Sequence, residues 1–391
     1  MKRQGLTSGY GFSGNPVIFA DADASGEVKE AIYRITMGGN TVYEGRYSLP
    51  ATLNISEIID NEISAVGLLP CAPNEWITKA LDLGEESANV MQLFVDYDNG
   101  GDYESSPIRF IPGKIPTALY RALELDGKDI FTERFLNPET NFIMTTRTTG
   151  TMIEIPETEL MPLAVLMPGG KSITVEAGGR KFRSSNLQAG IYWIDLGKIR
   201  EMLFWSNMGL SQIVNLFKIY YSDSESSISV LITYCEPAME IIIIRYRYSF
   251  DIPELLALDG YLTVTPQPFS KAGEYLIHQP ISDDFAYGKE PEQPRLTLTL
   301  NTGMVAAKDI PRLLEALYSR EVEIISPVDG SSIKVIPSME DFTFPLRPEE
   351  PQIFEIKMKV CADDLSLLGA LAPDDSDPWR IFSREHNDKF N

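Results

Sequence analysis

The first stretch whose residue types suit a binding site is the acidic turn at residues 21–27, Asp-Ala-Asp-Ala-Ser-Gly-Glu. Carboxylate and hydroxyl oxygens at alternate positions are ligands that Ca²⁺ prefers, and the glycine allows a sharp turn around the ion. The candidate calcium ligands are Asp21, Asp23, Ser25 and Glu27. An EF-hand also needs a glutamate at the twelfth loop position, where this chain has Ile32. A solvated acidic turn is the alternative interpretation, and both stay open.

No other group of residues in the sequence has the spacing of a known catalytic or phosphate-binding motif. Residues 169–172, Gly-Gly-Lys-Ser, end like a phosphate-binding loop, but Val165 replaces its first glycine and a strand pattern follows instead of a helix. Only His278 and His386 are present for histidine catalysis, and the chain has no Gly-x-Ser-x-Gly elbow. A second acidic turn at residues 96–104 does not match the calcium-loop pattern. We therefore expect no enzyme activity and no cofactor apart from calcium.

Two carbohydrate-directed alternatives stay open. A glycosidase needs two facing carboxylates, and the 56 acidic residues have no spacing that singles out a pair. Exposed aromatic rings would form a sugar platform in a glycan-binding adhesin module, although aromatics at strand spacing are more often core residues or cross-strand pairs. The aromatic residues concerned are Trp76, Tyr192, Trp193, Tyr220, Tyr221, Tyr246 and Tyr248.

Charge and hydropathy exclude two classes of partner. The net charge of -22 predicts repulsion from nucleic acid and from anionic membranes. The longest apolar cluster, residues 241–244, is far shorter than the roughly 20 residues that span a bilayer. No apolar segment follows the basic residues Lys2 and Arg3, so we expect no signal peptide and a cytoplasmic location during assembly. The three cysteines, Cys71, Cys235 and Cys361, lack metal-site spacing and are interpreted as small buried side chains.

The elements around these residues are organised by an internal repeat. An alternating strand at residues 31–37 turns at Gly38-Gly39, and its counterpart at residues 172–177 turns at Gly178-Gly179. The two turns are 140 residues apart, and a short helix is expected after each hairpin, near residues 57–62 and 194–199. A second pair of matched hairpins follows in the same order, at residues 90–110 and 216–231. This order predicts a duplicated β-rich unit.

Several local features are predicted from turn and helix signals. Ser56 is expected to cap the helix at residues 57–62, and a second helix is expected at residues 116–123. A further hairpin is expected from residues 141–147 and 151–155. Residues 295–300 form a predicted strand that ends at a turn, Asn301-Thr302-Gly303. Residues 309–318 have helical spacing with one apolar face.

The fold class is therefore predicted as mainly β, with tandem duplicated β-sandwich-like domains, short helices, and a smaller C-terminal α+β or β-rich domain. The first repeat domain is assigned to residues 1–156 and the second to residues 157–266. The C-terminal domain with one helix is assigned to residues 267–371, and an acidic, aromatic tail to residues 372–391. The tail is expected either to dock on a partner or to be frayed.

Three segments of the chain resemble a family of proteins. Residues 9–19, 141–147 and 252–260 are similar to stretches of uncharacterised, prophage-encoded, β-rich proteins of gut Bacteroidales. The resemblance would cover most of the chain but includes no active-site motif. It implies a structural role in a virion or phage tail and supplies no functional residues.

The predicted function is that of a non-enzymatic structural or assembly protein, a phage-like virion or tail-associated component. Its partners would be other protein subunits in an oligomeric assembly, with no nucleic acid and no membrane insertion. Exposed strand edges and hairpin tips would supply the contacts, because they offer unpaired backbone groups to neighbouring chains. A glycan-binding adhesin and a carbohydrate-active enzyme with paired carboxylates are the alternatives.

Overall fold

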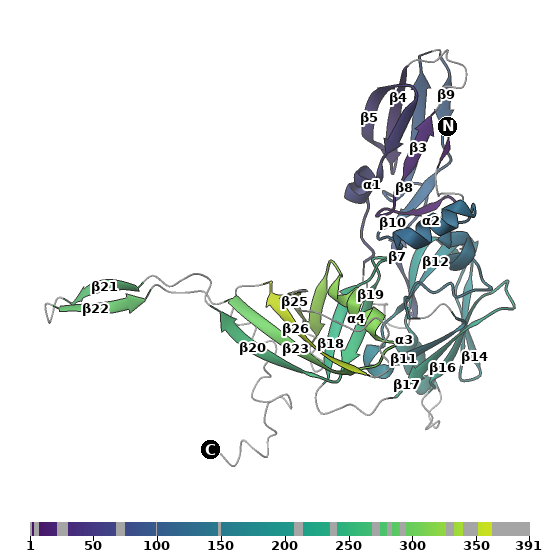
Figure 1. Cartoon of the computed structure of the whole chain (residues 1–391). Helices are drawn as coiled ribbons and strands as arrows, with labels where there is room; N and C mark the ends of the chain where they lie inside the picture. Colours follow the sequence, from purple (N-terminus) through teal and green to yellow (C-terminus); the bar gives the residue numbers. More distant parts are fainter. Residues whose placement is uncertain are drawn as a thin grey trace. The chain divides into compact units, whose positions relative to one another are not determined.

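The protein is mainly β, which confirms the predicted fold class (Figure 1). Its computed structural model describes residues 2–3, 8–21, 30–67, 75–98, 100–147, 150–206, 214–234, 241–267, 274–279, 284–289, 295–325, 332–338 and 351–361. The chain divides into two compact units. Unit 1 comprises Met1–Cys235 and Tyr248–Pro253, and unit 2 comprises Glu236–Arg247 and Glu254–Asn391. The boundaries after residues 156, 266 and 371 stay predictions.

The first half of unit 1 consists of two sheets that share a core. The larger sheet has the order β2-β10-β8-β4-β5, with β9 also paired to β8, and the smaller has the order β1-β3-β6. The strands are β1 (Lys2–Arg3), β2 (Tyr10–Phe12), β3 (Ile18–Asp21), β4 (Glu30–Met37), β5 (Asn40–Ser48), β6 (Ala51–Asn54), β8 (Val90–Tyr97), β9 (Asp102–Glu104) and β10 (Ile108–Ile111). Phe19 of the smaller sheet packs with Tyr33 and Leu93 of the larger. The arrangement is sandwich-like.

The second half of unit 1 repeats the topology of the larger sheet. Its larger sheet has the order β11-β17-β16-β13-β14, and its smaller sheet has the order β12-β15-β7. The strands are β7 (Ile77–Asp82), β11 (Met152–Pro156), β12 (Leu163–Lys171), β13 (Ile173–Ala177), β14 (Arg180–Arg183), β15 (Leu187–Ile194), β16 (Leu216–Tyr221) and β17 (Ile228–Thr233). In each half one pair is parallel, β2 with β10 and β11 with β17. The two large sheets therefore have the same strand order and the same pattern of directions.

The repeated hairpins turn where the sequence predicts. Gly38 and Gly39 have φ values of 54° and 80°, and Gly178 and Gly179 have φ values of 56° and 74°. Two successive positive φ angles match the right-handed twist of the flanking strands in a two-residue hairpin, and glycine adopts them without steric cost. The Gly-Gly pairs thus define both hairpins, β4–β5 and β13–β14.

Short helices connect the strands of unit 1. They are α1 (Ser56–Glu62), α2 (Thr117–Leu125) and α3 (Leu196–Ser206), together with the single turns η1 (Phe131–Phe135) and η2 (Glu157–Glu159). Helix α1 buries Ile59 and helix α3 buries Ile199 and Leu203, each within the core of its own half. The predicted helices near residues 57–62, 116–123 and 194–199 are confirmed. None of the helices in the described part of the chain has the length and apolar character needed to cross a bilayer.

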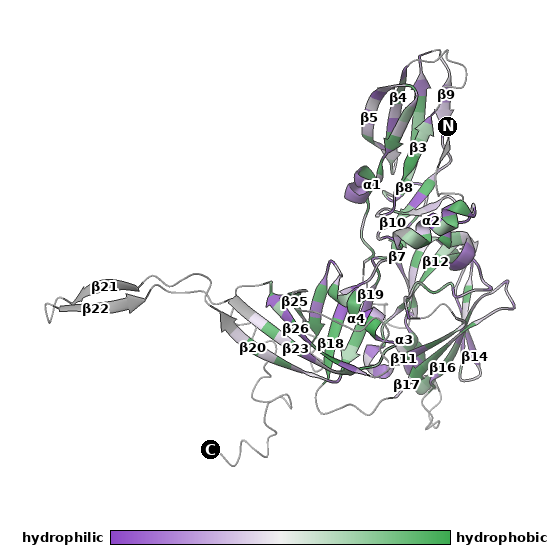
Figure 2. Cartoon of the chain, viewed as in Figure 1, coloured by the Kyte–Doolittle hydropathy of each residue, from purple (hydrophilic) through white to green (hydrophobic). Residues whose placement is uncertain are grey.

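Unit 2 is built on one seven-stranded sheet with the order β19-β18-β24-β25-β26-β23-β20. The strands are β18 (Ile242–Arg247), β19 (Pro253–Leu258), β20 (Tyr261–Gln267), β23 (Arg295–Val305), β24 (Val322–Ile325), β25 (Ser332–Pro337) and β26 (Gln352–Val360). Hydrophobic and hydrophilic residues alternate along much of β23 and β26 (Figure 2). Helix α4 (Ile310–Leu317) packs against β18 and buries Ile310, Leu313, Ala316 and Leu317. A separate two-stranded sheet comprises β21 (Glu274–Gln279) and β22 (Asp284–Lys289).

Two predicted local structures in unit 1 are wrong. Residues 141–147 and 151–155 do not form a hairpin, because β11 pairs with β17 and Ile143 bridges to Val165. The Arg134 side chain donates to the carbonyls of Asn141 and Thr145, which satisfies these backbone acceptors outside a ladder. Ser56 does not cap α1, because it is the first helical residue and its Oγ accepts the Val17 N–H at 2.9 Å.

Three further expectations are corrected in unit 2. Strands β18 and β20, expected at the end of the second repeat, lie in the seven-stranded sheet. The predicted turn at Asn301–Gly303 is instead a bulge between Asn301 and Met304, through which β23 continues to Val305. A bulge inserts an extra residue without ending the strand, so the local turn signal was misleading. Cys361, expected to be buried, is exposed.

Candidate interaction surfaces

Asp21, the one described member of the predicted calcium site, links the two sheets of the first half. It is buried at the end of β3, and its Oδ2 accepts hydrogen bonds from the Tyr33 hydroxyl at 3.1 Å and the Tyr97 hydroxyl at 2.6 Å. Burial, followed by the Asp21 carboxylate, raises the pKa of both tyrosines. Asp23, Ser25 and Glu27 lie outside the described residues, so the calcium site stays a prediction.

The second acidic turn is a solvent-exposed hairpin end. Asp96 lies 3.4 Å from Arg34, and Asp98 accepts the backbone N–H of Glu30 at 3.3 Å. Asp102 and Glu104 are exposed in β9. Within the described ranges, no three His, Cys, Asp or Glu side chains are grouped so that they could hold a metal ion.

The Gly-Gly-Lys-Ser segment forms an irregular strand end. The register of β12 shifts between Pro168 and Lys171, and Gly169 and Gly170 have positive φ angles. Lys171 Nζ lies 3.1 Å from Asp223 Oδ2 and 5.6 Å from the Tyr221 ring centroid. The hydrogen bond from Lys171 lowers the pKa of Asp223. The lysine thus contacts neighbouring side chains of its own half, and the strand that follows it excludes a phosphate-binding loop.

The aromatic residues considered for a sugar platform are mostly core residues. Six of the seven are buried, namely Trp76, Tyr192, Trp193, Tyr221, Tyr246 and Tyr248, and Tyr220 is half-buried. The Trp193 indole donates to the Gly67 carbonyl at 2.7 Å, and the Tyr221 hydroxyl donates to the Leu166 carbonyl at 3.0 Å. A ring buried in this way cannot stack on a sugar. His278 belongs to β21, and His386 lies outside the described residues.

The described buried carboxylates have structural partners. Glu159 forms an ion pair with Arg147 at 2.6 Å, with side-chain exposures of 4% and 8%. Asp129 accepts the backbone N–H groups of Ser8 and Phe131 at 2.8 and 2.9 Å. Buried charges are retained in proteins when they are paired or hydrogen-bonded. These ion pairs and hydrogen bonds connect the two carboxylates to other parts of the chain. They do not place two carboxylates opposite each other around a substrate.

A small cavity in unit 1 lies between β2 and α2. It is lined by Phe12, Tyr120, Glu124 and Phe131 among other residues, and its volume is about 20 Å³. Glu124 Oε1 is buried there without a hydrogen-bond partner among the described residues. A cavity of this size holds about one water molecule, which would satisfy the oxygen. It is too small for a metabolite or a sugar.

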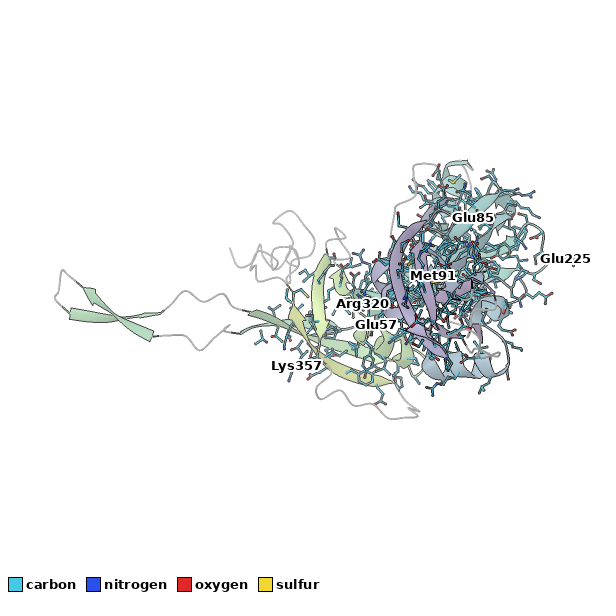
Figure 3. All side chains as sticks on the ribbon, turned by 90° about the horizontal axis from the view of Figure 1, so that it is seen from above. Glu57, Glu85, Met91, Glu225, Arg320 and Lys357 are labelled. Carbon is cyan, nitrogen blue, oxygen red and sulfur yellow. The ribbon has the colours of Figure 1, made fainter. Side chains whose placement is uncertain are left out.

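A further candidate surface is one face of the seven-stranded sheet in unit 2, which we call the outward face. Along β26, Phe354, Ile356 and Met358 are buried, whereas the residues between them point to solvent. The exposed residues of β26 are Ile353, Glu355, Lys357 and Lys359, of which Lys357 is labelled in Figure 3. Lys357 and Lys359 have no carboxylate partner in the described part of the chain. The outward face therefore offers positive charge on a strongly acidic protein.

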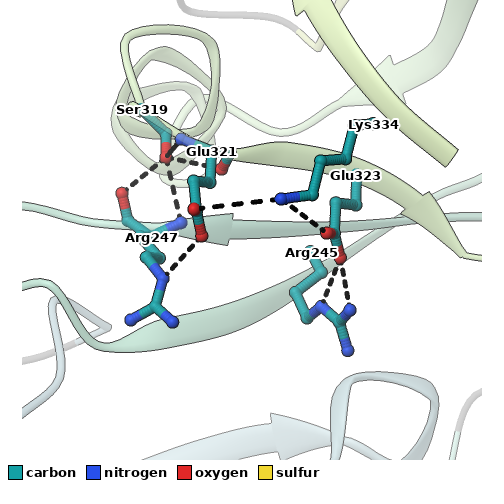
Figure 4. Close-up of polar contacts among 6 residues, drawn as sticks. All are labelled: Arg245, Arg247, Ser319, Glu321, Glu323 and Lys334. Carbon is teal, nitrogen blue, oxygen red and sulfur yellow. Dashed lines mark hydrogen bonds and ion pairs between the residues drawn. The ribbon is translucent and has the colours of Figure 1, made fainter. Parts of the chain in front are cut away.

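An ion-pair network occupies the part of the outward face formed by β18, β24 and β25 (Figure 4). Arg245 pairs with Glu323, and Arg247 Nε lies 2.8 Å from Glu321 Oε2. Lys334 lies 4.0 Å from both glutamates. The hydrogen bond from Arg247 lowers the pKa of Glu321. Each charged side chain of this network has an oppositely charged partner. Lys357 and Lys359 of β26 differ, because they have no carboxylate partner in the described part of the chain.

The other end of the outward face has an apolar patch, defined by Tyr261 of β20, Met304 of β23 and Ile353 of β26. Their exposed fractions are 49%, 76% and 58%. Met304 and Ile353 are direct cross-strand partners, and Tyr261 pairs with Asn301 next to the bulge. Cross-strand and diagonal neighbours lie close enough for large side chains to touch. The sequence does not indicate this patch, because Met304 follows the predicted turn and only the long-range pairing of β20, β23 and β26 brings the three residues together.

Comparison with known proteins gives no assignment. No protein-family model matches the chain, and no curated protein matches it.

Proposed function

We propose that this chain is a non-enzymatic structural protein that works by binding other protein subunits, as a phage-like virion or tail-associated component. The observation that carries the proposal is the apolar patch on the outward face of unit 2. Apolar residues scattered singly over a surface need no explanation, but neighbouring ones are typical of protein interfaces. Burial of such a patch in a complex contributes roughly 25 cal/mol for each Å² of apolar surface.

Open strand edges give further support. β5 is nine residues long and pairs only with β4 among the described strands, so the backbone groups on its other side are available to a neighbour. β20 ends the seven-stranded sheet in the same way. Such edges pair with strands of other chains, which is a common mode of subunit addition.

The test measures association of the full chain. Its molar mass is determined by light scattering, alone and mixed with the products of the genes that flank its own. We expect a mass above that of the monomer in at least one sample, and weaker association for Met304→Asp. The matched control is Leu125→Asp in α2, because Leu125 is 88% exposed and lies outside the patch. A monomer in every sample would refute the proposal.

The phage-like assignment has its own test. Mass spectrometry of purified particles from the host should detect the chain, and its gene should lie among tail or capsid genes. A chain found only outside particles, in an unrelated gene neighbourhood, would remove this part of the proposal and leave the assembly role.

A further inference from the structure

The strand β14, at the edge of the larger sheet in the second half of unit 1, carries only basic charges. Its residues are Arg180, Lys181, Phe182 and Arg183. It pairs only with β13 among the described strands (Figure 1). Lys181 and Arg183 are exposed, whereas Phe182 packs against the second core. Because successive side chains of a strand point to opposite faces, the two cations lie on the face of the sheet that points away from this core.

The backbone groups on the open side of β14 belong to the same two residues. The Ser184 N–H donates to the Ile173 carbonyl at 3.0 Å, so these residues form a hydrogen-bonded pair across the hairpin. Hydrogen-bonded and non-hydrogen-bonded pairs alternate along an antiparallel ladder. Lys181 and Arg183 lie three residues and one residue before Ser184, and they belong to the non-hydrogen-bonded pairs. Their N–H and C=O groups therefore point away from β13, where another strand can bind them.

Positive charge exceeds negative charge on the exposed face beside this edge. Glu176 of β13 lies between Lys181 on one side and Lys218 of β16 on the other. Its carboxylate is 3.6 Å from Lys181 Nζ. Arg183 donates to the neutral hydroxyl of Ser172 at 3.4 Å. One carboxylate thus faces two lysines, and the arginine contacts a neutral group, so the edge accommodates further carboxylates.

The counterpart of β14 in the first half has a different charge. β5 ends the larger sheet of that half in the same way, and its charged residues are Glu44 and Arg46. Glu44 lies 3.2 Å from Arg34 of β4. Arg46 lies 3.6 Å from Glu30 of β4. The edge strand β5 therefore has no net charge, and the basic edge belongs to the second half alone and not to the repeated architecture.

An extended acidic polypeptide fits the open side of β14 better than other partners do. The outward N–H and C=O groups match the backbone of an added strand, which a nucleic acid does not supply. A nucleic acid would also meet the net charge of -22 on the chain. Basic side chains protect an edge from pairing with copies of itself, because like charges would lie opposite each other. The same side chains attract a strand with acidic residues.

We propose that β14 binds an extended acidic segment of another protein subunit by strand addition, with carboxylates opposite Lys181 and Arg183. Because these two residues are separated by one position, the segment should carry acidic residues at every second position. The inference rests on the proposed assembly function and adds the chemistry of one partner and the edge that binds it.

The first experiment measures peptide binding to the full chain by fluorescence anisotropy. The probe is a labelled seven-residue peptide in which glutamate alternates with valine, and a second peptide has lysine in place of glutamate. We expect the acidic peptide to bind and the basic peptide to bind at least tenfold more weakly. Equal binding of the two peptides would overturn the proposal.

Three charge reversals locate the site. Lys181→Glu and Arg183→Glu should each weaken binding of the acidic peptide at least fivefold. The matched control is Arg46→Glu in β5, which changes the charge equally at the counterpart edge and should weaken binding less than twofold. Circular dichroism should be unchanged in all three variants, because the three side chains are exposed. An equal loss in the control would show that overall charge governs binding and would overturn the proposal.

The second experiment separates strand addition from a contact through charge alone. One acidic peptide is N-methylated at its glutamate amides and another at its valine amides. Only one set of amides faces β14 in an added strand, the glutamate set in antiparallel addition and the valine set in parallel addition. We expect one methylated peptide to bind at least tenfold more weakly and the other to bind normally. Unchanged binding of both would overturn strand addition.

Hydrogen exchange followed by mass spectrometry tests the other occupants. The amides of Lys181 and Arg183 should exchange quickly in the full chain alone and slowly with the acidic peptide. Protection in the chain alone, at a concentration where it is monomeric, would show that a segment of the same chain occupies the edge and would overturn the partner subunit. A single-stranded oligonucleotide that binds more tightly than the acidic peptide would overturn the polypeptide as ligand.

The outcomes also separate this inference from the proposed function. If the acidic peptide does not bind but the chain associates with products of neighbouring genes, the role of β14 is refuted and the assembly function stands. If the peptide binds but the chain is monomeric in every mixture, the assembly function is refuted and the peptide site on β14 stands.

Discussion

The two halves of unit 1 have the same large sheet but differ in how their smaller sheets are completed. In the first half, β1 lies beside β3, whereas in the second half β7 lies beside β15. β7 belongs to residues that follow α1, so the first half of the sequence supplies a strand to the second half of the structure. Trp76, which precedes β7, is accordingly part of the second core. The repeat is therefore not two independent modules.

The halves also differ in the polar groups that they bury. In the first, Asp21 accepts hydrogen bonds from two neutral hydroxyls, those of Tyr33 and Tyr97. In the second, Glu159 is paired with the guanidinium of Arg147. The same strand order thus tolerates different buried polar chemistry, because the alternating apolar residues define the sheets. Removal of these polar groups should therefore lower the free energy of unfolding by different amounts.

The largest expected effect tests the tryptophan that precedes β7 and packs in the second core. Trp76→Ala should lower the free energy of unfolding by about 3–5 kcal/mol, the usual cost of removing a large aromatic side chain from a core. The residue is 8% exposed and packs in the second core. Urea unfolding followed by circular dichroism measures the change, with Leu125→Ala as an exposed control. A loss below about 1 kcal/mol would show that the Trp76 side chain contributes little to the second core.

The next effect concerns the buried ion pair of the second half. Glu159→Ala should cost about 3 kcal/mol, because it leaves the Arg147 guanidinium buried without its carboxylate. The double variant Arg147→Met/Glu159→Leu should be closer to the native stability, since no buried charge is left at the pair. Urea unfolding of both variants gives the comparison. Equal losses in the single and double variants would contradict the argument from buried charge.

A smaller effect is expected at the neutral hydrogen bonds of the first half. Asp21→Ala removes the acceptor of the Tyr33 and Tyr97 hydroxyls and should cost about 1–3 kcal/mol. A double-mutant cycle with Tyr97→Phe should give a coupling energy of at least about 0.5 kcal/mol. If the two losses are simply additive, Asp21 does not stabilise the sheets through Tyr97.

The smallest effect is expected at the exposed ion pair of the second half. Asp223→Asn should change stability by no more than about 0.5 kcal/mol, because Lys171 and Asp223 are 41% and 61% exposed. The hydrogen bond from Lys171 lowers the pKa of Asp223 in the folded protein, so any stabilisation is present above the unfolded pKa of about 4 and is lost as the pH falls. Thermal unfolding at neutral and acidic pH checks both statements. A variant that is more destabilised at acidic pH than at neutral pH would contradict the sign.

Much of the local structure follows from the sequence alone. Alternation of apolar and polar residues predicted the strands near residues 31–37 and 172–177, and the Gly-Gly pairs predicted their turns. The spacing of Ile310, Leu313 and Leu317 predicted α4. These signals are reliable because period, turn conformation and amphipathic spacing are determined by residues a few positions apart.

Only the tertiary structure decided which strands are neighbours. Nothing local distinguishes β7 as a partner of β15, β2 as a parallel partner of β10, or the bulge of β23 from a turn. The apolar patch shares this origin, because Tyr261, Met304 and Ile353 are distant in sequence and meet only through the pairing of β20, β23 and β26. Strand pairing is a long-range choice made by packing of the whole sheet, and a one-residue change of register reverses which side chains face the solvent. The sequence thus determined the elements and their turns, whereas the surface proposed to bind other subunits exists only in the folded sheet.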